Sequence, residues 1–408
     1  MIFSKEKNKM NIVLLNRWAC QQVGGVENHL LQLSKLLHDA GHTVHLISQG
    51  DAYISRFKSK SNVHSSRMGT GIKFVRMAHF FFYALVKLRQ IRPDFVITAF
   101  SFDSLIARVG VCFSPHLTAN IAQENTIFEK IENDYVDLPI FTNPIIANLC
   151  EHEKGCYKEF IISGGKIEPW SDHLMSEPEI KILTVCRLDC RKNLDFIFEI
   201  ARSLQKRGIS FEWNVVGTGD ELDHLIALKD KYKLTQNINF VGYVSFDALQ
   251  NFYNISHIFC LPSFFEGFGL VFLEAFSYHI PVVAKDGGAT RFVIGSCGIV
   301  LDSSDPDVFS EAIILCVQSQ AYKNKELYLD NLSRFSVARQ TQQLEEIVGA
   351  LIDMRRELKR GSCYFMRIPI SVVLHLTSYV DIIFRNMWAR SPYEKLINGR
   401  FKRRFLIR

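Results

Sequence analysis

Apolar strands and amphipathic helices alternate along most of this 408-residue chain, and the alternation restarts once. Apolar residues at helical spacing predict helices, and short continuous apolar runs predict buried strands. Strand followed by helix followed by strand predicts a parallel sheet with right-handed crossovers. The first series consists of the strands Asn11–Leu15, Thr43–Ser48 and Asp94–Thr98, with helices over Val26–Leu37 and about Phe74–Gln90.

The second series is longer and more regular. Its predicted elements are Ile182–Cys186, Asn193–Lys206, Phe211–Val216, Asp220–Tyr232, Ile238–Val241, Phe246–Asn254, His257–Leu261, Leu270–Tyr278 and Pro281–Ala284. The segment Ser163–Pro178 between the two series is rich in Gly, Ser and Pro and has no periodicity, which is typical of a linker. We therefore expect an α/β fold with two Rossmann-like, doubly wound domains facing a central cleft, where ligands of such sheets bind.

The chain is too long for one ordinary core, which also favours two domains. The expected organisation is an N-terminal domain over 1–165, a linker over 166–180, a C-terminal domain over 181–335, a helix over 336–360 and a basic amphipathic tail over 361–408.

The positive charge of the chain is concentrated in its tail. The formal net charge is +6, but residues 355–408 hold 13 Lys and Arg against 3 Asp and Glu. No nucleic-acid-binding motif accompanies these cations, so we expect no nucleic-acid partner. Cations beside apolar runs predict peripheral attachment to an anionic membrane surface. The alternative is a basic helix that packs on the body of the protein or binds a partner.

Neither end of the chain predicts a spanning or secreted segment. The run at 12–15 is too short for the apolar core of a signal peptide. The apolar run at 364–384 is interrupted by Arg367, Pro369, His375 and Asp381, which a spanning helix would not usually tolerate. The ten cysteines include no paired CxxC motif, so neither a zinc ribbon nor a disulfide framework is indicated. We expect a cytoplasmic protein on the cytoplasmic face of the membrane.

The segment 261–290 carries the most informative chemistry. A strand ends near Pro262, a loop carries Glu266, and a helix begins near Gly269 with Glu274 one turn inside it. Glycines allow close approach of the backbone to a ligand, and a helix start offers N–H groups to an anion or a polar sugar. The two carboxylates can accept hydrogen bonds from hydroxyl groups of the same molecule. The alternative is a glycine-containing loop with two solvated glutamates.

This segment resembles the motif of glycosyltransferase family 4, whose members are retaining enzymes with the GT-B fold and use nucleotide-diphosphate sugars. Two glutamates with seven residues between them enclose a Gly-Phe-Gly turn. The resemblance implies that Glu266 contacts the donor sugar and that Glu274 contacts the ribose. The sugar and phosphate would be held by the backbone of Gly267, Phe268, Gly269 and Leu270.

Two further segments resemble motifs of the same family. In Val185–Asn193, the resemblance implies that Arg187 and Lys192 bind the diphosphate, and two cations at a sheet edge suit a leaving diphosphate. The alternative is that Arg187 pairs with an acid and Lys192 is solvated. The family's N-terminal glycine loop corresponds to Gly24 and Gly25, although a plain tight turn before a helix would look the same.

Two other positions complete the predicted donor site. Gly217 ends a strand and resembles a family turn that borders the diphosphate. The loop at 242–244, with Tyr243 at its centre, would flank the base, mainly through backbone atoms.

The chain also departs from the family. The two histidines common in the N-terminal domain are absent, and Glu124 and Asn125 occupy the second region. Arg291 replaces the acid of the family's Gly-Gly-x-x-Glu segment. His116 lies near these positions, but a lone histidine favours a structural role. These departures concern how the acceptor is activated.

The expected function is retaining transfer of a sugar to a glycan or lipid-linked saccharide in cell-surface polysaccharide or glycolipid synthesis. The catalytic residues would be Glu266, Arg187 and Lys192. No cofactor or metal is expected, because Asp305-Pro306-Asp307 has the pattern of a helix start. The alternatives are a nucleotide-sugar-binding protein without transferase activity, or a phosphorylase, epimerase or hydrolase of the same fold.

Overall fold

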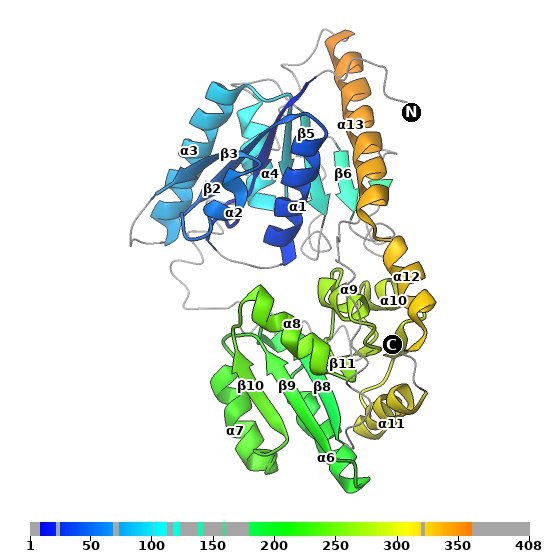
Figure 1. Cartoon of the computed structure of the whole chain (residues 1–408). Helices are drawn as coiled ribbons and strands as arrows, with labels where there is room; N and C mark the ends of the chain where they lie inside the picture. Colours follow the sequence, from blue (N-terminus) through cyan, green and yellow to red (C-terminus); the bar gives the residue numbers. More distant parts are fainter. Residues whose placement is uncertain are drawn as a thin grey trace.

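The structure is a computed structural model that describes residues 9–21, 25–67, 73–99, 101–111, 117–122, 138–141, 158–159, 179–319 and 323–360. These residues form two α/β domains, each with a parallel sheet between layers of helices (Figure 1). Two parallel-sheet domains are what the alternating pattern predicted, and this part of the prediction is confirmed.

The N-terminal domain contains a seven-stranded parallel sheet in the order β3-β2-β1-β4-β5-β6-β7. Its strands are β1 (Asn11–Leu15), β2 (Thr43–Gln49), β3 (Asn62–Ser66), β4 (Phe95–Thr98), β5 (Leu117–Ala122), β6 (Leu138–Phe141) and β7 (Lys158–Glu159). Its helices are α1 (Gly25–Asp39), α2 (Ser55–Lys58), α3 (Lys73–Ile91) and α4 (Ser101–Gly110).

Strands β1 and β4 at the centre of this sheet are apolar because helices cover both faces. Leu14 of β1 packs in one cluster with Leu30 and Leu37 of α1. Its neighbour Val13 points to the other face and joins a cluster that includes Phe80 of α3. A strand buried on both sides therefore has no alternation of polar and apolar residues.

The C-terminal domain contains a six-stranded sheet in the order β10-β9-β8-β11-β12-β13. Its strands are β8 (Ile180–Val185), β9 (Phe211–Val216), β10 (Ile238–Gly242), β11 (Ile258–Leu261), β12 (Val282–Lys285) and β13 (Gly298–Leu301). Its helices are η4 (Cys190–Lys192), α6 (Asp195–Lys206), α7 (Leu222–Tyr232), α8 (Phe246–Ile255), α9 (Leu270–Ser277), α10 (Thr290–Ile294), α11 (Pro306–Gln318) and α12 (Lys325–Ser333).

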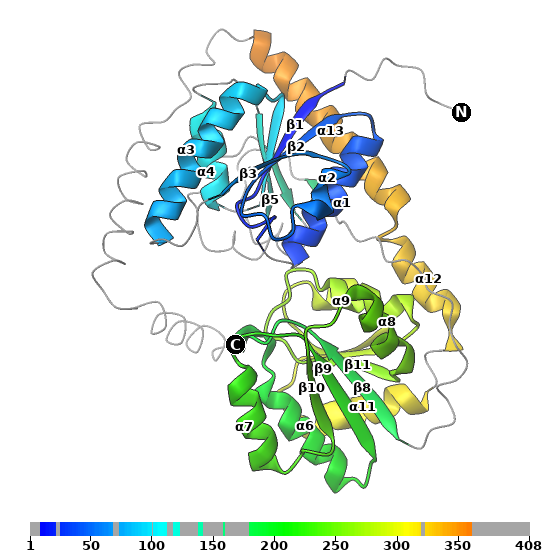
Figure 2. The same ribbon diagram turned by 60° about the vertical axis from the view of Figure 1, so that its left-hand side comes forward.

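The order of this sheet reverses between β8 and β11, its two central strands. Trp213 of β9 packs with residues of α6 and α11 on one face. Phe259 of β11 packs with Phe272 of α9 and Tyr328 of α12 on the other. The arrowheads of β9 and β10 point toward the N-terminal domain in Figures 1 and 2. The loops after the strands thus lie at the edge of the sheet that is nearer the other domain.

The last described helix, α13 (Val337–Arg360), belongs to the core of the N-terminal domain. Leu344, Ile347 and Leu351 are buried in the same cluster as Leu30 of α1. In Figures 1 and 2 this helix runs from α12 back along the N-terminal domain. The polypeptide therefore crosses between the domains a second time.

The bounds of the elements predicted from the sequence agree with the structure to within two residues. The helix start at 305–307 is also confirmed, since Asp305 caps α11 by accepting a hydrogen bond from the Asp307 N–H at 2.8 Å, and Pro306 opens the helix. The predicted linker 166–180 lies outside the described residues except at 179 and 180, and the tail 361–408 lies outside them altogether. Among the helices that are described, none combines the length and apolar character needed to cross a bilayer.

Candidate functional site

The candidate site lies on the loops that follow β8, β9, β11 and β12. These strands are neighbours in the sheet, so the loops after them meet at one edge. The edge includes the reversal between β8 and β11, where parallel α/β sheets bind ligands.

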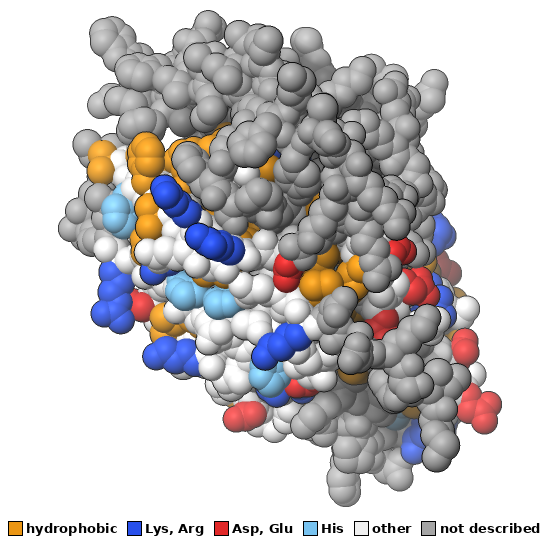
Figure 3. Space-filling model, turned by 90° about the horizontal axis from the view of Figure 1, so that it is seen from above, with side chains coloured by type: hydrophobic (Ala, Val, Ile, Leu, Met, Phe, Trp, Pro, Cys, Tyr) orange, Lys and Arg blue, Asp and Glu red, His pale blue; other side chains and the backbone are white. Residues whose placement is uncertain are grey.

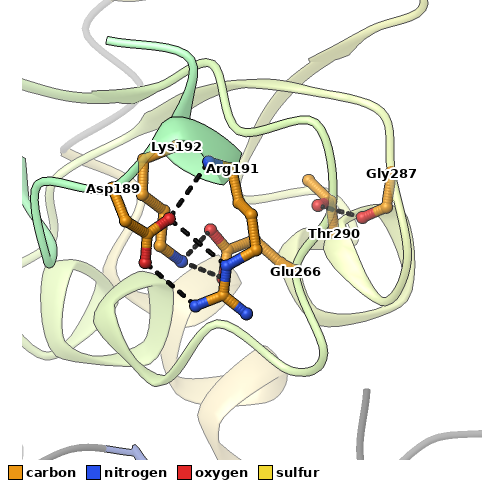
Figure 4. Close-up of polar contacts among 6 residues, drawn as sticks. All are labelled: Asp189, Arg191, Lys192, Glu266, Gly287 and Thr290. Atoms are coloured by element: carbon orange, nitrogen blue, oxygen red, sulfur yellow. Dashed lines mark hydrogen bonds and ion pairs between the residues drawn. The ribbon is translucent and has the colours of Figure 1, made fainter. Parts of the chain in front are cut away.

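An ion pair between the loop after β8 and the loop after β11 lies at the centre of this edge. Lys192 Nζ lies 2.8 Å from Glu266 Oε1 and 3.0 Å from Oε2 (Figure 4). The side chains are only 15% and 7% exposed. A cation and a carboxylate this sheltered interact more strongly than a pair on the surface, and each depends on the other for its charge balance. The alternative in which Lys192 is solvated is therefore wrong.

The loop after β8 is fixed by its own polar groups. Asp189 caps η4 by accepting a hydrogen bond from the Arg191 N–H, and its side chain also pairs with the Arg191 guanidinium at 2.9 Å (Figure 4). Asn193 follows in the left-handed conformation with φ 53°, and its side-chain amide donates to Pro262 O at 3.1 Å. The loop that carries Lys192 is thus bonded directly to the loop that carries Glu266.

The backbone of Glu266 is held from the other side by the loop after β12. Ala289 N donates to Glu266 O at 2.8 Å, and Glu266 N donates to Gly287 O at 3.3 Å. A Cβ atom on Gly288 would collide with the Glu266 carbonyl oxygen. Both glycines of this loop are needed for the close approach, because a Cβ atom on Gly287 would collide with Phe264 O. In the sequence, this glycine pair stands out only because the acid of the family's segment is missing after it.

Arg291, which stands in place of that acid, does not face the ion pair. Its guanidinium binds Asp286 Oδ2 at 2.7 Å. The substitution therefore gives the loop after β12 its own ion pair.

Glu274 lies one turn inside α9 and has a specific partner that the sequence did not indicate. The Tyr253 hydroxyl on α8 donates to Glu274 Oε2 at 2.8 Å. Burial raises the pKa of Glu274, and the hydrogen bond from Tyr253 opposes that rise. Tyr253 is itself buried, and its ring stacks on Tyr278 with centroids 5.2 Å apart. The carboxyl group is thus held in one orientation by a rigid aromatic donor.

The start of α9 has the geometry that the glycine turn predicted. Gly269 caps the helix with φ 85°, a left-handed conformation that favours glycine, and a Cβ atom there would collide with the Phe272 ring. Gly267 is buried, while Phe268 and Leu270 are half-buried. The Phe268 ring packs edge-on against Phe335 at 5.5 Å.

Arg187 lies directly after β8 and is exposed. Within the described part of the chain its side chain has no hydrogen-bond or ion-pair partner, so the alternative that paired it with an acid finds no support there. Gly217 follows β9 with φ 137°, and a Cβ atom there would collide with Cys186 O. Tyr243 is 71% exposed and follows β10. These residues lie at the same sheet edge as the ion pair, on three different loops.

The N-terminal side of the predicted site is described only in part. Gly25 begins α1, whereas Gly24 lies outside the described residues. His116, Glu124 and Asn125 also lie outside them. In the described regions no group of three or more His, Cys, Asp or Glu side chains is arranged to hold a metal ion.

Comparisons with known proteins identify the family of the chain. The family model described as "Glycosyl transferases group 1" matches residues 169–330, and the one described as "Glycosyltransferase Family 4" matches residues 23–136. The chain is 37% identical over 86 residues to the O-antigen chain mannosyltransferase B of Escherichia coli, covering 21% of this chain and 23% of that protein. It is 25% identical over 282 residues to an uncharacterized glycosyltransferase of Haemophilus influenzae, covering 64% and 76% of the two chains.

Solved structures share the fold at low sequence identity. The Anabaena protein HepE, solved in complex with UDP and glucose, superposes with a TM-score of 0.68 at 15% identity, covering 83% of this chain and 99% of that chain. The lipopolysaccharide outer core galactosyltransferase WaaB in its apo form gives a TM-score of 0.65 at 16% identity, with the same coverage. The fold is therefore that of the GT-B enzymes.

Proposed function

Since the chain belongs to the family 4 glycosyltransferases, we propose that it transfers a sugar, with retention of configuration, from a nucleotide-diphosphate sugar to a glycan or lipid-linked saccharide. The observation that carries the proposal is the sheltered Lys192–Glu266 pair at the sheet edge that also holds Arg187 and Glu274. Two cations and two carboxylates on neighbouring loops suit a ligand with phosphates at one end and hydroxyl groups at the other.

Lys192 and Arg187 would bind the diphosphate. Arg187 is exposed without a protein partner in the described residues, so it can meet an incoming anion at little cost. Lys192 would exchange part of its contact with Glu266 for a phosphate oxygen. This exchange frees carboxylate lone pairs of Glu266 to accept hydrogen bonds from hydroxyl groups of the donor sugar.

The nucleoside would lie beside Glu274. One of its carboxylate oxygens accepts from Tyr253, which leaves the other to accept from a ribose hydroxyl. The backbone of Gly267, Phe268, Gly269 and Leu270 would hold the sugar and phosphate, with Gly217 at the diphosphate and the loop of Tyr243 beside the base. Gly24 and Gly25 would approach the donor from the other domain.

The chemistry we propose is substitution on one face of the sugar. The bond from the anomeric carbon to the phosphate oxygen breaks, and a bond to the acceptor oxygen forms on the same face. The departing phosphate oxygen takes the acceptor proton, while Arg187 and Lys192 stabilise the charge that develops. We propose that no divalent cation takes part, so EDTA should leave turnover unchanged, and restoration of an EDTA-inhibited rate by Mg²⁺ would overturn this point.

The product would belong to a cell-surface polysaccharide or glycolipid made at the cytoplasmic face of the membrane. The Escherichia coli relative is an O-antigen chain mannosyltransferase, which supports this assignment. We propose that residues 355–408 contribute to attachment through their cations. A variant with Arg400, Lys402, Arg403 and Arg404 changed to alanine should bind anionic liposomes less tightly than the unchanged chain.

The deciding experiment measures donor binding and transfer separately. Thermal shifts with UDP-, GDP-, ADP- and CMP-sugars identify the donor, and NMR of the product reports the anomeric configuration. Glu266→Gln should reduce turnover while donor binding persists. Donor binding without transfer to any acceptor would instead identify a binding protein. Donor turnover without a glycan acceptor would identify a phosphorylase, epimerase or hydrolase.

A further inference from the structure

The outer face of α3 carries an apolar stripe on the surface of the N-terminal domain. Val75, Phe82 and Val86 are 45%, 66% and 54% exposed, which is unusual for large apolar side chains that recur on one helix. Their spacings of seven and four residues place them on one side of the helix. The exposed apolar side chains therefore lie along α3, with exposed His79 between Val75 and Phe82, rather than at one end of the helix.

The opposite side of α3 is fixed in the core, so the stripe cannot simply turn inward. Phe80, Ala84 and Leu88 are fully buried in the cluster that contains Ile47 and Val96 of the sheet. Tyr83 and Phe81 are half-buried at the borders of the stripe. The helix is thus apolar on two sides, and the domain itself buries only one of them.

Cations border the stripe, and α3 contains no acidic residue at all. Arg76 and Arg89 are exposed, and in the described residues neither has an ion-pair partner. Lys87 donates a hydrogen bond to Gln90 on the same helix. Figure 3 views the molecule from the N-terminal domain and shows apolar and basic side chains close together on the left, the side on which Figure 1 places α3.

The part of the N-terminal domain that contains β1 to β5 shares this sign of charge. Residues 1–122 contain 15 Lys and Arg against 6 Asp and Glu. A surface that is apolar along its centre, basic at its borders and free of acids complements the headgroups and acyl boundary of an anionic bilayer.

We infer that the outer face of α3 docks on an anionic membrane surface, with Phe82 and its apolar neighbours in the interface and Arg76 and Arg89 at the headgroups. A second copy of the chain is a poorer partner, because a symmetric contact through α3 would bring arginines together without an acid between them. The inference extends the proposed membrane attachment, but it depends on different residues from the tail and does not require transferase activity.

A local probe distinguishes docking of α3 from binding through any other segment. In the full-length chain, the fluorescence of a tryptophan introduced by Phe82→Trp should be quenched by vesicles that contain brominated phosphatidylserine. This quenching should be stronger than that of the four native tryptophans in the unchanged protein. The matched control is Ile226→Trp on α7 of the other domain, at a site 40% exposed, which should show no added quenching. Equal added quenching at both sites, or at neither, would overturn the inference.

Binding affinity gives the second test, measured by sedimentation with phosphatidylserine vesicles and no donor present. Arg76→Ala with Arg89→Ala should weaken binding by up to about 30-fold, since a near-surface cation contributes about 1 kcal/mol. Lys206→Ala with Lys231→Ala, two exposed cations of the other domain, should leave the affinity unchanged. Unchanged affinity of the α3 variant would overturn the inference. A dimer in solution that dissociates in the Phe82→Ser variant would also overturn it, because α3 would then bind a second copy of the chain.

Discussion

Removal of the Tyr253 hydroxyl should weaken donor binding without slowing the chemical step. Tyr253→Phe deletes one oxygen atom and keeps the ring, whose stacking on Tyr278 and Phe259 secures α8 in the core. The variant should therefore fold and melt nearly as the parent does. Glu274 alone loses a partner, the 2.8 Å hydrogen bond to its Oε2 atom.

The size of the effect follows from the chemistry of that bond. A hydrogen bond to a charged group contributes about 1.5–3 kcal/mol, and each 1.4 kcal/mol is a factor of ten in an equilibrium constant. Water can replace part of the lost bond, so we expect the donor KM to rise by about tenfold. Burial already raises the pKa of Glu274, and without the hydroxyl this pKa should rise further. The charged form that accepts from ribose is then less stable.

Steady-state rates at varied donor concentration test this prediction, and dideoxyribose analogues of the nucleotide make it specific. The parent enzyme should bind the ribonucleotide more tightly than its 2′,3′-dideoxy analogue, and Tyr253→Phe should lose most of that preference. Tyr278→Phe is the control, because it removes a hydroxyl from the stacked ring but keeps the bond between Tyr253 and Glu274. If kcat falls while KM and the ribose preference stay constant, Glu274 does not hold the ribose.

Three further perturbations test the site and its support. Lys192→Met and Glu266→Gln should each lower the free energy of unfolding by about 3 kcal/mol, because each leaves a sheltered charge without its partner. The double variant should lose less stability than the sum of the two single losses. Additive shifts in melting temperature would show that the two residues are not coupled. Gly288→Ala should reduce both stability and turnover. Gly208 also has a positive φ but has open space around it, so Gly208→Ala should lower the free energy of unfolding by only about 1 kcal/mol. Burial raises the pKa of Asp103 to about 7 from 3.8, so the folded state binds more protons than the unfolded state between these values, and stability should fall as pH rises through this window. Asp103→Asn should flatten that decline between pH 3.8 and about 7, and the same dependence of melting temperature on pH in both proteins would show that Asp103 is not its source.

The sheets could be predicted from sequence because their strands are buried on both faces. A run such as Asn11–Leu15 has consecutive apolar residues without alternation, which is the pattern of a short strand buried on both faces. Weaker elements had no such pattern: β3 at Asn62–Ser66 contains no run of apolar residues and forms only because β2 offers an edge to pair with. Its order in the sheet depends on contacts that local periodicity does not encode.

The residues of the predicted donor motif could be identified from the sequence, but the contacts that hold them in place could not. Glu266 and Lys192 are 74 positions apart, and only the adjacency of β8 and β11 brings them within 2.8 Å. The glycines at 287 and 288 matter through a collision with backbone atoms of another loop, which no local pattern reveals. Tyr253 could have been suspected only from its place near the end of α8, directly before the strand that leads into the motif.

The position of α13 shows most clearly where sequence reasoning ends. Its periodicity requires that one side be buried, yet nothing local decides which domain buries it. The structure places Leu344 and Ile347 in the N-terminal core, while Phe335, two residues before the helix begins, stays in the C-terminal core. Phe335 packs on Phe268 of the loop that carries Glu266, and the Arg334 guanidinium lies 4.9 Å from the centre of the Phe335 ring. The loop that carries Glu266 therefore packs against a residue that lies just before the chain leaves the C-terminal domain and rejoins the N-terminal one.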